Sequence, residues 1–382
     1  MHILILPSWY SLTENDTHGS FFKEQAESLV RAGNKVGILF PEDISLKKID
    51  IFYTKQKGIK FEQENGVYTY RYRCLNWLPR TGISSIFNWK YFGIKLYREY
   101  EKKHGKPDII HVHSMLYGGV LACFLKKKYN IPYVVTEHFS GYLSPNLNKL
   151  QKKYIKEILE SANRLFTVSR FFSNKMQKNF GFEWGVLPNL VNDSFFDNMS
   201  INDEKIFTFI CIGSLLKNKN QILVVRAFEK AFKNNSGVSL KIVGEGPEYN
   251  NIKEYILQND LKNIIMTGHA SRTQVKEYIS NSNCLVSGSN YETFSVVLIE
   301  ALAQGRPIIS TDCGGPRDIV NEKNGFLVPI NNVESMASAF ELVYTTKFNS
   351  QKIAQDCYQR FGEVSVTNRI LSIYNEIAKH GK

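Results

Sequence analysis

Two carboxylates eight residues apart, Glu292 and Glu300, stand near the two ends of an apolar segment in this chain of 382 residues. Glu292 comes just before a predicted helix, where the helix dipole alone favours a negative charge. Glu300 lies among aliphatic residues, and an unpaired carboxylate buried there would cost several kcal/mol. We therefore expect Glu300 to have a partner, which is either a pair of ligand hydroxyls or a structural Arg. The backbone amides of Thr293, Phe294 and Ser295 enter the same helix and are expected to point at an anion.

A glycine turn followed by lysines comes after a predicted strand in the segment CIGSLLKNKN, residues 211–220. Gly213 and Ser214 form the turn, and glycine lets a backbone approach a bound anion closely. Lys219 supplies a point charge for such an anion at the start of the next helix. A solvated helix start without any ligand is the alternative interpretation.

Glycines also follow two other predicted strands. The segment VGEGPE contains Gly244 and Gly246, but it is not a dinucleotide fingerprint because the third glycine of GxGxxG is missing. The segment TDCGGPR, residues 311–317, is a further glycine turn. Taken alone, both segments are explained as ordinary turns.

The first half of the chain offers a helix start and a set of histidines. Asp16–Ser20 (DTHGS), which includes Gly19, precedes a predicted helix whose N-terminus is a candidate for binding a phosphate. His138 follows a strand in TEHF, where a His or Glu could bind substrate or transfer a proton. His111 and His113 alternate on a strand, but a third ligand at a sensible spacing is missing, so we expect no metal site. A hydrogen-bonded structural role is the alternative for each histidine.

Short apolar strands alternate with amphipathic helices along both halves, which predicts crossover units and parallel sheets. In the first half we expect strands at 2–6, 36–40, 109–112, 133–136 and 165–168, and helices at 19–32, 117–128 and 147–162. In the second half we expect strands at 207–212, 239–243, 264–267, 284–287 and 307–310, and helices at 220–233, 249–258, 272–280 and 294–304. The tail, 358–382, also has a helical pattern.

This alternation predicts an α/β protein with two doubly wound Rossmann-like domains and a boundary near 190–203. Ligands of open parallel sheets bind at the carboxyl ends of the strands. We therefore expect the two domains to face a central cleft, with an active site that draws on strand-end loops of both.

The net charge of +12 is confined to one half of the chain. Residues 1–190 contain 28 Lys and Arg against 16 Asp and Glu, whereas residues 191–382 contain 20 of each. A one-sided basic field predicts an anionic partner, which is a membrane surface, a phosphorylated acceptor or nucleic acid. Aromatic residues alternate with cations in 71–80 and 86–95, and this composition suits the interface of an anionic membrane. A basic helix packed on its own domain is the alternative for this region.

Three further features limit the class of protein. The apolar start MHILILPSW breaks at Pro7 without a basic leader, which predicts a buried strand and not a signal peptide. The apolar run 115–125 is too short to span a bilayer. The six cysteines form no CxxC pair, which favours a reducing cytoplasm and argues against disulfides or structural zinc.

These segments, in this order, resemble the retaining glycosyltransferases of family 4, which have the GT-B fold. In the first half the resemblance lies in the opening from Pro7 to Val36, in TEHF, in LFTVSRF and in LPNLV. In the second half it runs through IGSLLKNKN, IVGEGPE and MTGH to NYETFSVVLIEALAQGRPIISTDCGGPRDIV and NGFLVP. The long block, with two glutamates eight positions apart followed by AxGxP, is its most specific part.

The resemblance implies a nucleotide-sugar donor without a cofactor or a metal, and it implies roles for individual residues. Glu300 would bind the ribose hydroxyls, and Glu292 would face the donor sugar, which His138 would also touch. The amides of 293–295 would hold the sugar and the diphosphate, and Lys219 would neutralise the diphosphate. The catalytic candidates are therefore His138, Glu292 and Lys219. The donor-binding set is completed by Gly19, Gly213, Ser214, Gly244, Gly246 and Gly268.

The resemblance also assigns a role to each domain. Residues 1–190, completed by a C-terminal helix at about 364–382, would bind the acceptor, and residues 191–363 would bind the nucleotide-sugar. One position departs from the family pattern, because Ser214 stands where an Arg is common. The loss of that Arg removes a planar phosphate clamp. Either Lys217 or Arg272 compensates for the loss, or the donor binds more weakly.

The function implied is transfer of a sugar, with UDP favoured over GDP as its carrier, to a polyprenyl-diphosphate-linked glycan in surface polysaccharide assembly. The enzyme would be cytoplasmic and peripherally bound to the inner face of the plasma membrane through its N-terminal domain. Retention would follow from same-face attack, with the leaving diphosphate as base and the protein supplying positioning and electrostatic stabilisation.

Two alternatives to this function stay open on the sequence. A sugar-nucleotide epimerase of the GT-B fold would bind the same donor without needing a lipid acceptor. A nucleic-acid-binding protein is suggested by charge alone and lacks a recognised motif, so we expect no nucleic acid partner. A phosphorylase using pyridoxal phosphate is disfavoured, because no lysine stands in the required context.

Overall fold

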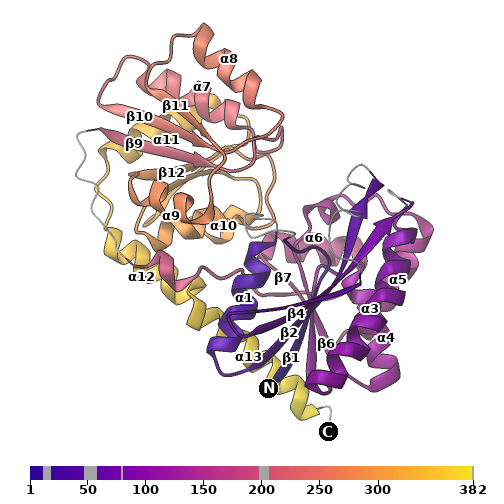
Figure 1. Ribbon diagram of the computed structural model, residues 1–382. Coiled ribbons are helices and arrows are strands. Elements are labelled where there is room, and N and C mark those ends of the chain that lie inside the picture. Colours follow the sequence, from indigo (N-terminus) through magenta and orange to yellow (C-terminus); the bar gives the residue numbers. More distant parts are fainter. Residues whose placement is uncertain (12–18, 47–57, 79–80, 198–205, 381–382) are drawn as a thin grey trace. The chain divides into compact units, whose positions relative to one another are not determined.

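The computed structural model describes residues 1–11, 19–46, 58–78, 81–197 and 206–380 (Figure 1). The chain forms two compact units, one of Met1–Pro188 with Val366–Lys382 and one of Asn189–Ser365. Each unit has a sheet of mainly parallel strands with helices packed against it. The expected α/β class with two Rossmann-like domains is therefore confirmed.

The sheet of the first unit has eight strands in the order β3-β4-β2-β1-β5-β6-β7-β8, and every pair except the β3–β4 hairpin is parallel. The strands are β1 (His2–Pro7), β2 (Lys35–Ser45), β3 (Ile59–Glu64), β4 (Val67–Asn76), β5 (Ile109–His113), β6 (Tyr133–Glu137), β7 (Arg164–Thr167) and β8 (Gly185–Val186). The helices are α1 (Ser20–Arg31), α3 (Ile83–His104), α4 (Gly118–Tyr129), α5 (Lys149–Ser161), α6 (Arg170–Phe180) and most of α13 (Glu363–His380). The strand order reverses between β1 and β5, which makes their carboxyl ends a topological switch point.

Strand β1 is central because its sequence is apolar on both faces. Residues 3–6 are all fully buried, as expected for a strand covered by helices on both sides. Helix α1 places Phe22, Ala26 and Leu29 on its buried face, at the spacing of an amphipathic helix. The core of the first unit therefore fixes the loop that follows β1.

The sheet of the second unit has six parallel strands in the order β11-β10-β9-β12-β13-β14. The strands are β9 (Phe207–Ile212), β10 (Val238–Val243), β11 (Ile264–Gly268), β12 (Cys284–Ser287), β13 (Ile308–Thr311) and β14 (Gly325–Val328). The helices are α7 (Gln221–Phe232), α8 (Tyr249–Gln258), α9 (Arg272–Ser280), α10 (Val296–Ala303), α11 (Val333–Thr345) and α12 (Ser350–Phe361). This is the 3-2-1-4-5-6 order of a Rossmann sheet, and its switch point lies between β9 and β12.

Four phenylalanines fill the core beneath β9, and they come from the strand and from helices α7 and α11. The ring of Phe209 meets the ring of Phe340 edge to face, with the centroids 4.7 Å apart. Phe228 and Phe232 complete the cluster. Edge-to-face packing of this kind adds to the stability that simple burial provides. The loop after β9 therefore leaves from a rigid base.

The region around β2 and β4 differs from what the sequence predicts. The second strand was expected only at 36–40. Instead it continues to Ser45, paired throughout with β4. The β3–β4 hairpin was not predicted at all, because the cations of β4 obscure its strand pattern. Part of the expected membrane segment 71–80 is therefore a strand inside the sheet.

Two helix boundaries also differ. The helix expected at 294–304 begins only at Val296, because Ser295 has a φ of 101° that no α-helix contains. The helical tail expected from 358 is two helices, α12 and α13, separated at Gly362. The break occurs because Gly362 is extended and bridges to Val191.

Candidate functional site

The loops after β9, β12 and β13 lie together at the carboxyl edge of the second sheet. Backbone hydrogen bonds connect them, since the Asn290 amide donates to the Asn218 carbonyl over 2.8 Å and the Gly315 amide donates to the Glu292 carbonyl over 2.9 Å. Because β9 and β12 flank the switch point, these loops stand where Rossmann-like sheets bind their ligands.

Lys219 and Glu292 form an ion pair between two of these loops. The Ser289 hydroxyl donates to the same Glu292 oxygen, Oε1, over 2.9 Å. The Glu292 side chain is 14% exposed and the Lys219 side chain 31%, so both are held in place and can still be reached from solvent. The structure thus brings together two of the three predicted catalytic residues. Ser289 was missed, although its position three residues before Glu292 is a spacing at which side chains of a turn meet.

Glu300 is buried in the middle of α10, with 2% of its side chain exposed. Its carboxylate is paired with the guanidinium of Arg272, the first residue of α9. Arg272 also lies over the ring of Phe195, 5.0 Å from the ring centroid. Of the two partners that the sequence allowed for Glu300, the structure supplies the Arg. Arg272 is one of the two residues that were expected to compensate for Ser214. In this structure its guanidinium is engaged with Glu300.

The glycines after β9 and β10 differ in what surrounds them, and therefore in why a glycine stands at each position. Gly213 has a φ of 151°, and a Cβ placed there would meet no atom within 4 Å, so its surroundings are open. A Cβ on Gly244 would lie 2.0 Å from the Gly213 carbonyl oxygen, and one on Gly246 would lie 2.4 Å from the Leu215 carbonyl oxygen. These two glycines are therefore needed to press one loop against the other. Ser214 is exposed at the tip of the β9 loop.

The turn before α10 contains the predicted anion-binding amides. The side chain of Phe294 is buried against Phe361, with ring centroids 5.7 Å apart, so only its backbone is a candidate for ligand contact. Ser295, with its unusual φ of 101°, precedes the first helical residue. A Cβ on Gly315 would lie 2.4 Å from the Phe294 amide nitrogen, so the next loop supports this turn at close range. Strained backbone of this kind is typical of functional sites.

Gly268 ends β11 in the left-handed region, and its carbonyl accepts a hydrogen bond of 2.8 Å from the Gly244 amide. It therefore lies two strands away from β9 in the sheet. In the first unit, Gly19 precedes α1 with a φ of 83°. The predicted Asp16, Thr17 and His18 lie outside the described residues.

His138 belongs to a cluster of histidines in the first unit. Its Nε2 lies 3.0 Å from Nδ1 of His113, and its ring packs on Phe21 and Phe22. His111 is hydrogen-bonded through Nδ1 to the hydroxyl of Tyr374 over 2.6 Å and through Nε2 to the hydroxyl of Thr136 over 2.8 Å. In the described part of the chain, no group of three His, Cys, Asp or Glu side chains is arranged to hold a metal ion.

Burial determines the protonation state of this cluster. It lowers the pKa of His138 and of His111 to about 3, and it lowers the pKa of His113 well below the ordinary 6.5, with further repulsion from the neighbouring rings. All three imidazoles are therefore neutral near pH 7. A neutral His138 can donate or accept one hydrogen bond, but it is a poor source of protons.

Two family models match adjoining parts of the chain. The model described as Glycosyltransferase Family 4 matches residues 19–195. The model described as Glycosyl transferases group 1 matches residues 193–360. Together they span both structural units.

Individual relatives cover nearly the whole chain. It is 25% identical over 383 residues to the putative teichuronic acid biosynthesis glycosyltransferase TuaC of Bacillus subtilis, which covers 94% of this chain and 93% of that protein. The solved sucrose-phosphate synthase of Thermosynechococcus elongatus has the same fold, with a TM-score of 0.77 at 17% identity over 99% of both chains. HepE of Anabaena, solved in complex with UDP, matches with a TM-score of 0.73 at 15% identity, over 98% of this chain and 100% of that one. The two family models and this likeness over both units show that the chain belongs to the family 4 glycosyltransferases, with the GT-B fold.

Proposed function

We propose that this glycosyltransferase moves a sugar from a nucleotide-sugar, with UDP as the favoured nucleotide, to a glycan acceptor, and that it retains the anomeric configuration. The observation that carries the proposal is the pair of ion pairs, Lys219–Glu292 and Arg272–Glu300, in the second unit. The UDP found in the HepE structure supports the choice of nucleotide. The name of TuaC, which refers to teichuronic acid biosynthesis, supports a polysaccharide product.

The two ion pairs match the two ends of such a donor. A diphosphate needs cations, which Lys219 and Arg272 supply, and the amides of 293–295 at the start of α10 add oriented dipoles. Ribose and sugar hydroxyls need acceptors, which the carboxylates of Glu300 and Glu292 supply. Each ion pair would then exchange its internal partner for part of the donor. Because the charges are already balanced within the pairs, the site carries no uncompensated buried charge before this exchange.

The proposed chemistry is attack of the acceptor hydroxyl from the face that the diphosphate leaves. The bond from the anomeric carbon to the diphosphate oxygen breaks, the bond to the acceptor oxygen forms, and the acceptor proton passes to the leaving diphosphate. Lys219 and the α10 amides would stabilise the charge that develops on the leaving oxygens. With these groups in place the reaction is expected to proceed without a metal. Contacts of Gly19 and His138 with the donor stay predictions.

The proposed acceptor is a polyprenyl-diphosphate-linked glycan at the cytoplasmic face of the membrane, which the enzyme would contact through its first unit. No helix of the described residues is long and apolar enough to cross a membrane. Arg71 and Arg73, which were expected at the membrane surface, are instead paired with Glu62 and Glu42 on the sheet. Farther along, large apolar side chains do reach the surface in the segment after β4 and on α3, which also carries the exposed Lys90, namely Trp77, Leu78, Ile83, Phe87 and Tyr91. Aromatic residues beside a lysine suit the headgroup region of an anionic membrane.

Product analysis tests this function. The enzyme is incubated in EDTA with UDP-sugars and with a synthetic polyprenyl-diphosphate glycan, and both products are identified by mass spectrometry and NMR. The proposal predicts free UDP together with an acceptor that is longer by one sugar, joined in the same anomeric configuration as in the donor. An epimer of the donor without acceptor extension would support the epimerase alternative instead, and an inverted linkage would contradict retention.

A further inference from the structure

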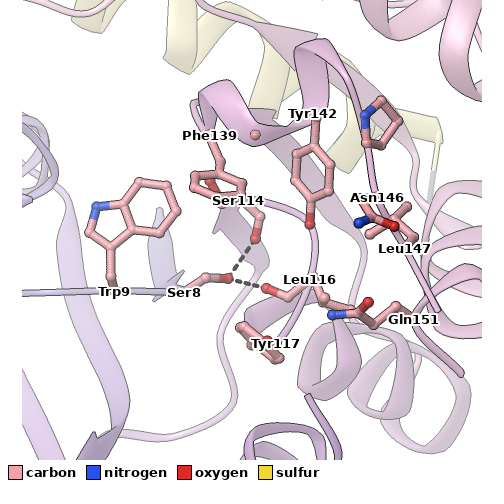
Figure 2. Close-up of a pocket in the computed structure, with 12 residues that line it drawn as sticks. Ser8, Trp9, Ser114, Leu116, Tyr117, Phe139, Tyr142, Asn146, Leu147 and Gln151 are labelled. Atoms are coloured by element: carbon pink, nitrogen blue, oxygen red, sulfur yellow. Dashed lines mark hydrogen bonds between the residues drawn. The ribbon is translucent and has the colours of Figure 1, made fainter. Parts of the chain in front are cut away.

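A hollow of about 280 Å³ lies in the first unit at the switch point of its sheet (Figure 2). The loops that follow β1, β5 and β6 border it, together with the segment that leads into α5. This is the place where an open parallel sheet binds ligands, and it lies in the unit that carries neither Lys219–Glu292 nor Arg272–Glu300. The hollow is therefore a candidate ligand site, separate from the two ion pairs of the second unit.

The described lining of the hollow carries no charged side chain, although the hollow belongs to the basic half of the chain. Of the twelve described residues that line it, none is Asp, Glu, Lys, Arg or His. An anion placed there would lose its hydration without gaining a cation, which is costly. Phosphates and carboxylated sugars are thus poor candidates for its occupant.

Aromatic side chains form much of the wall. Trp9 and Phe139 lie side by side, with ring centroids 6.1 Å apart, and Phe139 meets Tyr142 edge to face at 5.4 Å. Figure 2 shows these three rings around the hollow, with Tyr117 on the opposite side. The C–H face of a pyranose ring is apolar and slightly positive, so it packs favourably on the faces of such rings.

The polar groups suit the hydroxyl edge of a sugar. The hydroxyl of Tyr142 points into the hollow, which is bordered by the amides of Asn146 and Gln151 (Figure 2). Burial raises the pKa of Tyr142 well above its ordinary value, so this hydroxyl stays a neutral donor. Ser8 is already engaged, because its hydroxyl donates to the Ser114 carbonyl over 2.7 Å and accepts from the Gly118 amide over 3.1 Å.

A buried carboxylate, Glu137, sets the shape of the hollow. It accepts hydrogen bonds from the hydroxyl of Ser114 over 2.7 Å and from the amides of Met115, His138 and Phe139, each over 2.8 Å. These bonds fix the loops after β5 and β6 against each other. They also hold Ser114 at a φ of 65°, a conformation that side chains other than glycine rarely adopt. A protein keeps such strain where a precise wall is needed.

We propose that this hollow binds an uncharged saccharide ring of the acceptor glycan, with the C–H face of the ring on Trp9 and Phe139 and its hydroxyls toward Tyr142, Asn146 and Gln151. Glu137 is a positioning residue, because it holds the wall without touching the saccharide. The inference rests on the proposed glycosyltransferase function and adds to it the chemical class of the acceptor sugar. Any phosphate or carboxylate of the acceptor would lie outside the hollow.

Saccharide binding to the full chain tests the inference without catalysis. Binding of neutral methyl glycosides and disaccharides is measured by saturation-transfer NMR titration, with methyl glucoside compared directly with methyl glucuronide. Wild type is expected to bind at least one neutral probe, and to bind the glucuronide at least tenfold more weakly than the glucoside. Failure of every neutral probe at tens of millimolar, or a preference for the glucuronide, would overturn the inference.

A matched pair of variants locates the binding. Phe139 is 50% exposed in the hollow and Phe87 is 49% exposed on α3, outside it. Phe139→Ala is expected to weaken neutral saccharide binding at least tenfold, whereas Phe87→Ala leaves it unchanged. Gly141→Ala gives a second reading, since its Cβ would lie 2.3 Å from the Phe139 ring and must displace that ring. Equal saccharide binding by all three variants and wild type would place the site elsewhere and refute the proposal.

A parallel titration with UDP separates this inference from the proposed function. All of these variants are expected to bind UDP as wild type does, because none of the changed residues belongs to the proposed donor site. Loss of saccharide binding with UDP binding intact is the predicted result for Phe139→Ala. If wild type binds the neutral saccharide but not UDP, the donor proposal fails while the hollow stands. If it binds UDP but no neutral saccharide, only the assignment of the hollow fails.

Discussion

The guanidinium of Arg272 is paired with the carboxylate of Glu300, a residue 28 positions later in the chain that is almost completely buried. Arg272 itself is 34% exposed, so the pair joins the interior of α10 to the surface at the start of α9. The helices that carry them, α9 and α10, precede and follow β12 in the chain. This relationship yields the first prediction.

Arg272→Ala is expected to destabilise the protein more than Glu300→Gln. Removing the cation leaves a buried carboxylate without its partner, which costs about 2–4 kcal/mol once the partial exposure of the pair is allowed for. Glutamine at 300 is neutral and leaves an Arg that solvent can reach. Urea denaturation measures the free energy of unfolding of both variants. Arg317→Ala is the control, since its pair with Asp312 is exposed and its loss should change stability by less than about 1 kcal/mol.

Lys219→Ala is expected to weaken UDP binding by about 10- to 100-fold, the range for losing one charge-assisted hydrogen bond. Calorimetric titration of UDP in EDTA measures the change. Lys217→Ala is the matched control, because Lys217 is an exposed lysine only two residues earlier. Similar affinity losses in the two variants would mean that net charge alone matters, or that Lys217 compensates for Ser214.

Gly244→Ala is expected to destabilise the second unit and to disturb the β9 loop. The added Cβ would lie 2.0 Å from the Gly213 carbonyl oxygen at a φ of 143°, so clash and backbone strain act together. Gly33→Ala provides the comparison, because Gly33 has a φ of 81° and no atom within 4 Å of its Cβ position. It should therefore cost only the strain, about 1–2 kcal/mol. Thermal unfolding measures the stability of both variants. Equal losses of stability would show that the β9 and β10 loops are not in close contact.

Stability is expected to fall as the pH drops below about 6.5. The pKa of His111 and of His138 is about 3 in the folded protein against 6.5 ordinarily, so between these values the unfolded chain binds more protons. Each such histidine then costs up to about 1.4 kcal/mol per pH unit. Burial raises the pKa of Glu137, which acts in the opposite direction above its ordinary 4.5, so the test uses a variant.

His111→Gln measures the histidine contribution directly. Glutamine can replace the hydrogen bonds to Tyr374 and Thr136 but does not titrate. In this variant the melting temperature should fall less steeply as the pH drops from about 6.5 to about 4.5. An unchanged slope in His111→Gln would contradict the assigned protonation states.

Binding to anionic vesicles is expected to depend on the exposed aromatic residues of α3. The double change Phe87→Ser and Tyr91→Ser removes two apolar side chains of that surface and should reduce vesicle flotation several-fold at low salt. Leu257→Ser, which removes an exposed leucine of the second unit, is the control. Flotation that survives the double change would refute this contact surface.

The sequence predicted most strands and helices of both units because their periods are strong, whereas β8, β14, α6 and α11 were not predicted. β12, α8 and α9 have the bounds expected from the pattern, since polar residues end each run sharply. The β3–β4 hairpin was missed because the arginines of β4 look solvent-facing until Glu42 and Glu62 are seen to pair with them. Long-range partners of this kind leave no local signal in a sequence.

The candidate site was predictable only in part, because residue types and positions after strands are visible in the sequence but long-range side-chain partners are not. Glu292 and Lys219 were identified by residue type and by their place after strands, and the structure pairs them. The Arg272–Glu300 pair was only one of two options, because sequence spacing does not reveal which side chain fills a buried position. The uncharged hollow could not be found at all, since Trp9, Phe139 and Tyr142 come from loops that meet only in the folded chain.

The most direct test of the central claim is a thermal-shift panel in EDTA with UDP, GDP, ADP and CMP, run on wild type and on Lys219→Ala. A ligand at 100 times its dissociation constant adds about 2.7 kcal/mol to stability, which corresponds to a shift of a few degrees. The account predicts a shift of wild type with UDP that falls to about half or less in Lys219→Ala, as a 10- to 100-fold weaker affinity requires. No shift with any nucleotide, or an equal shift in the variant, would contradict a donor site built around Lys219 and Glu292.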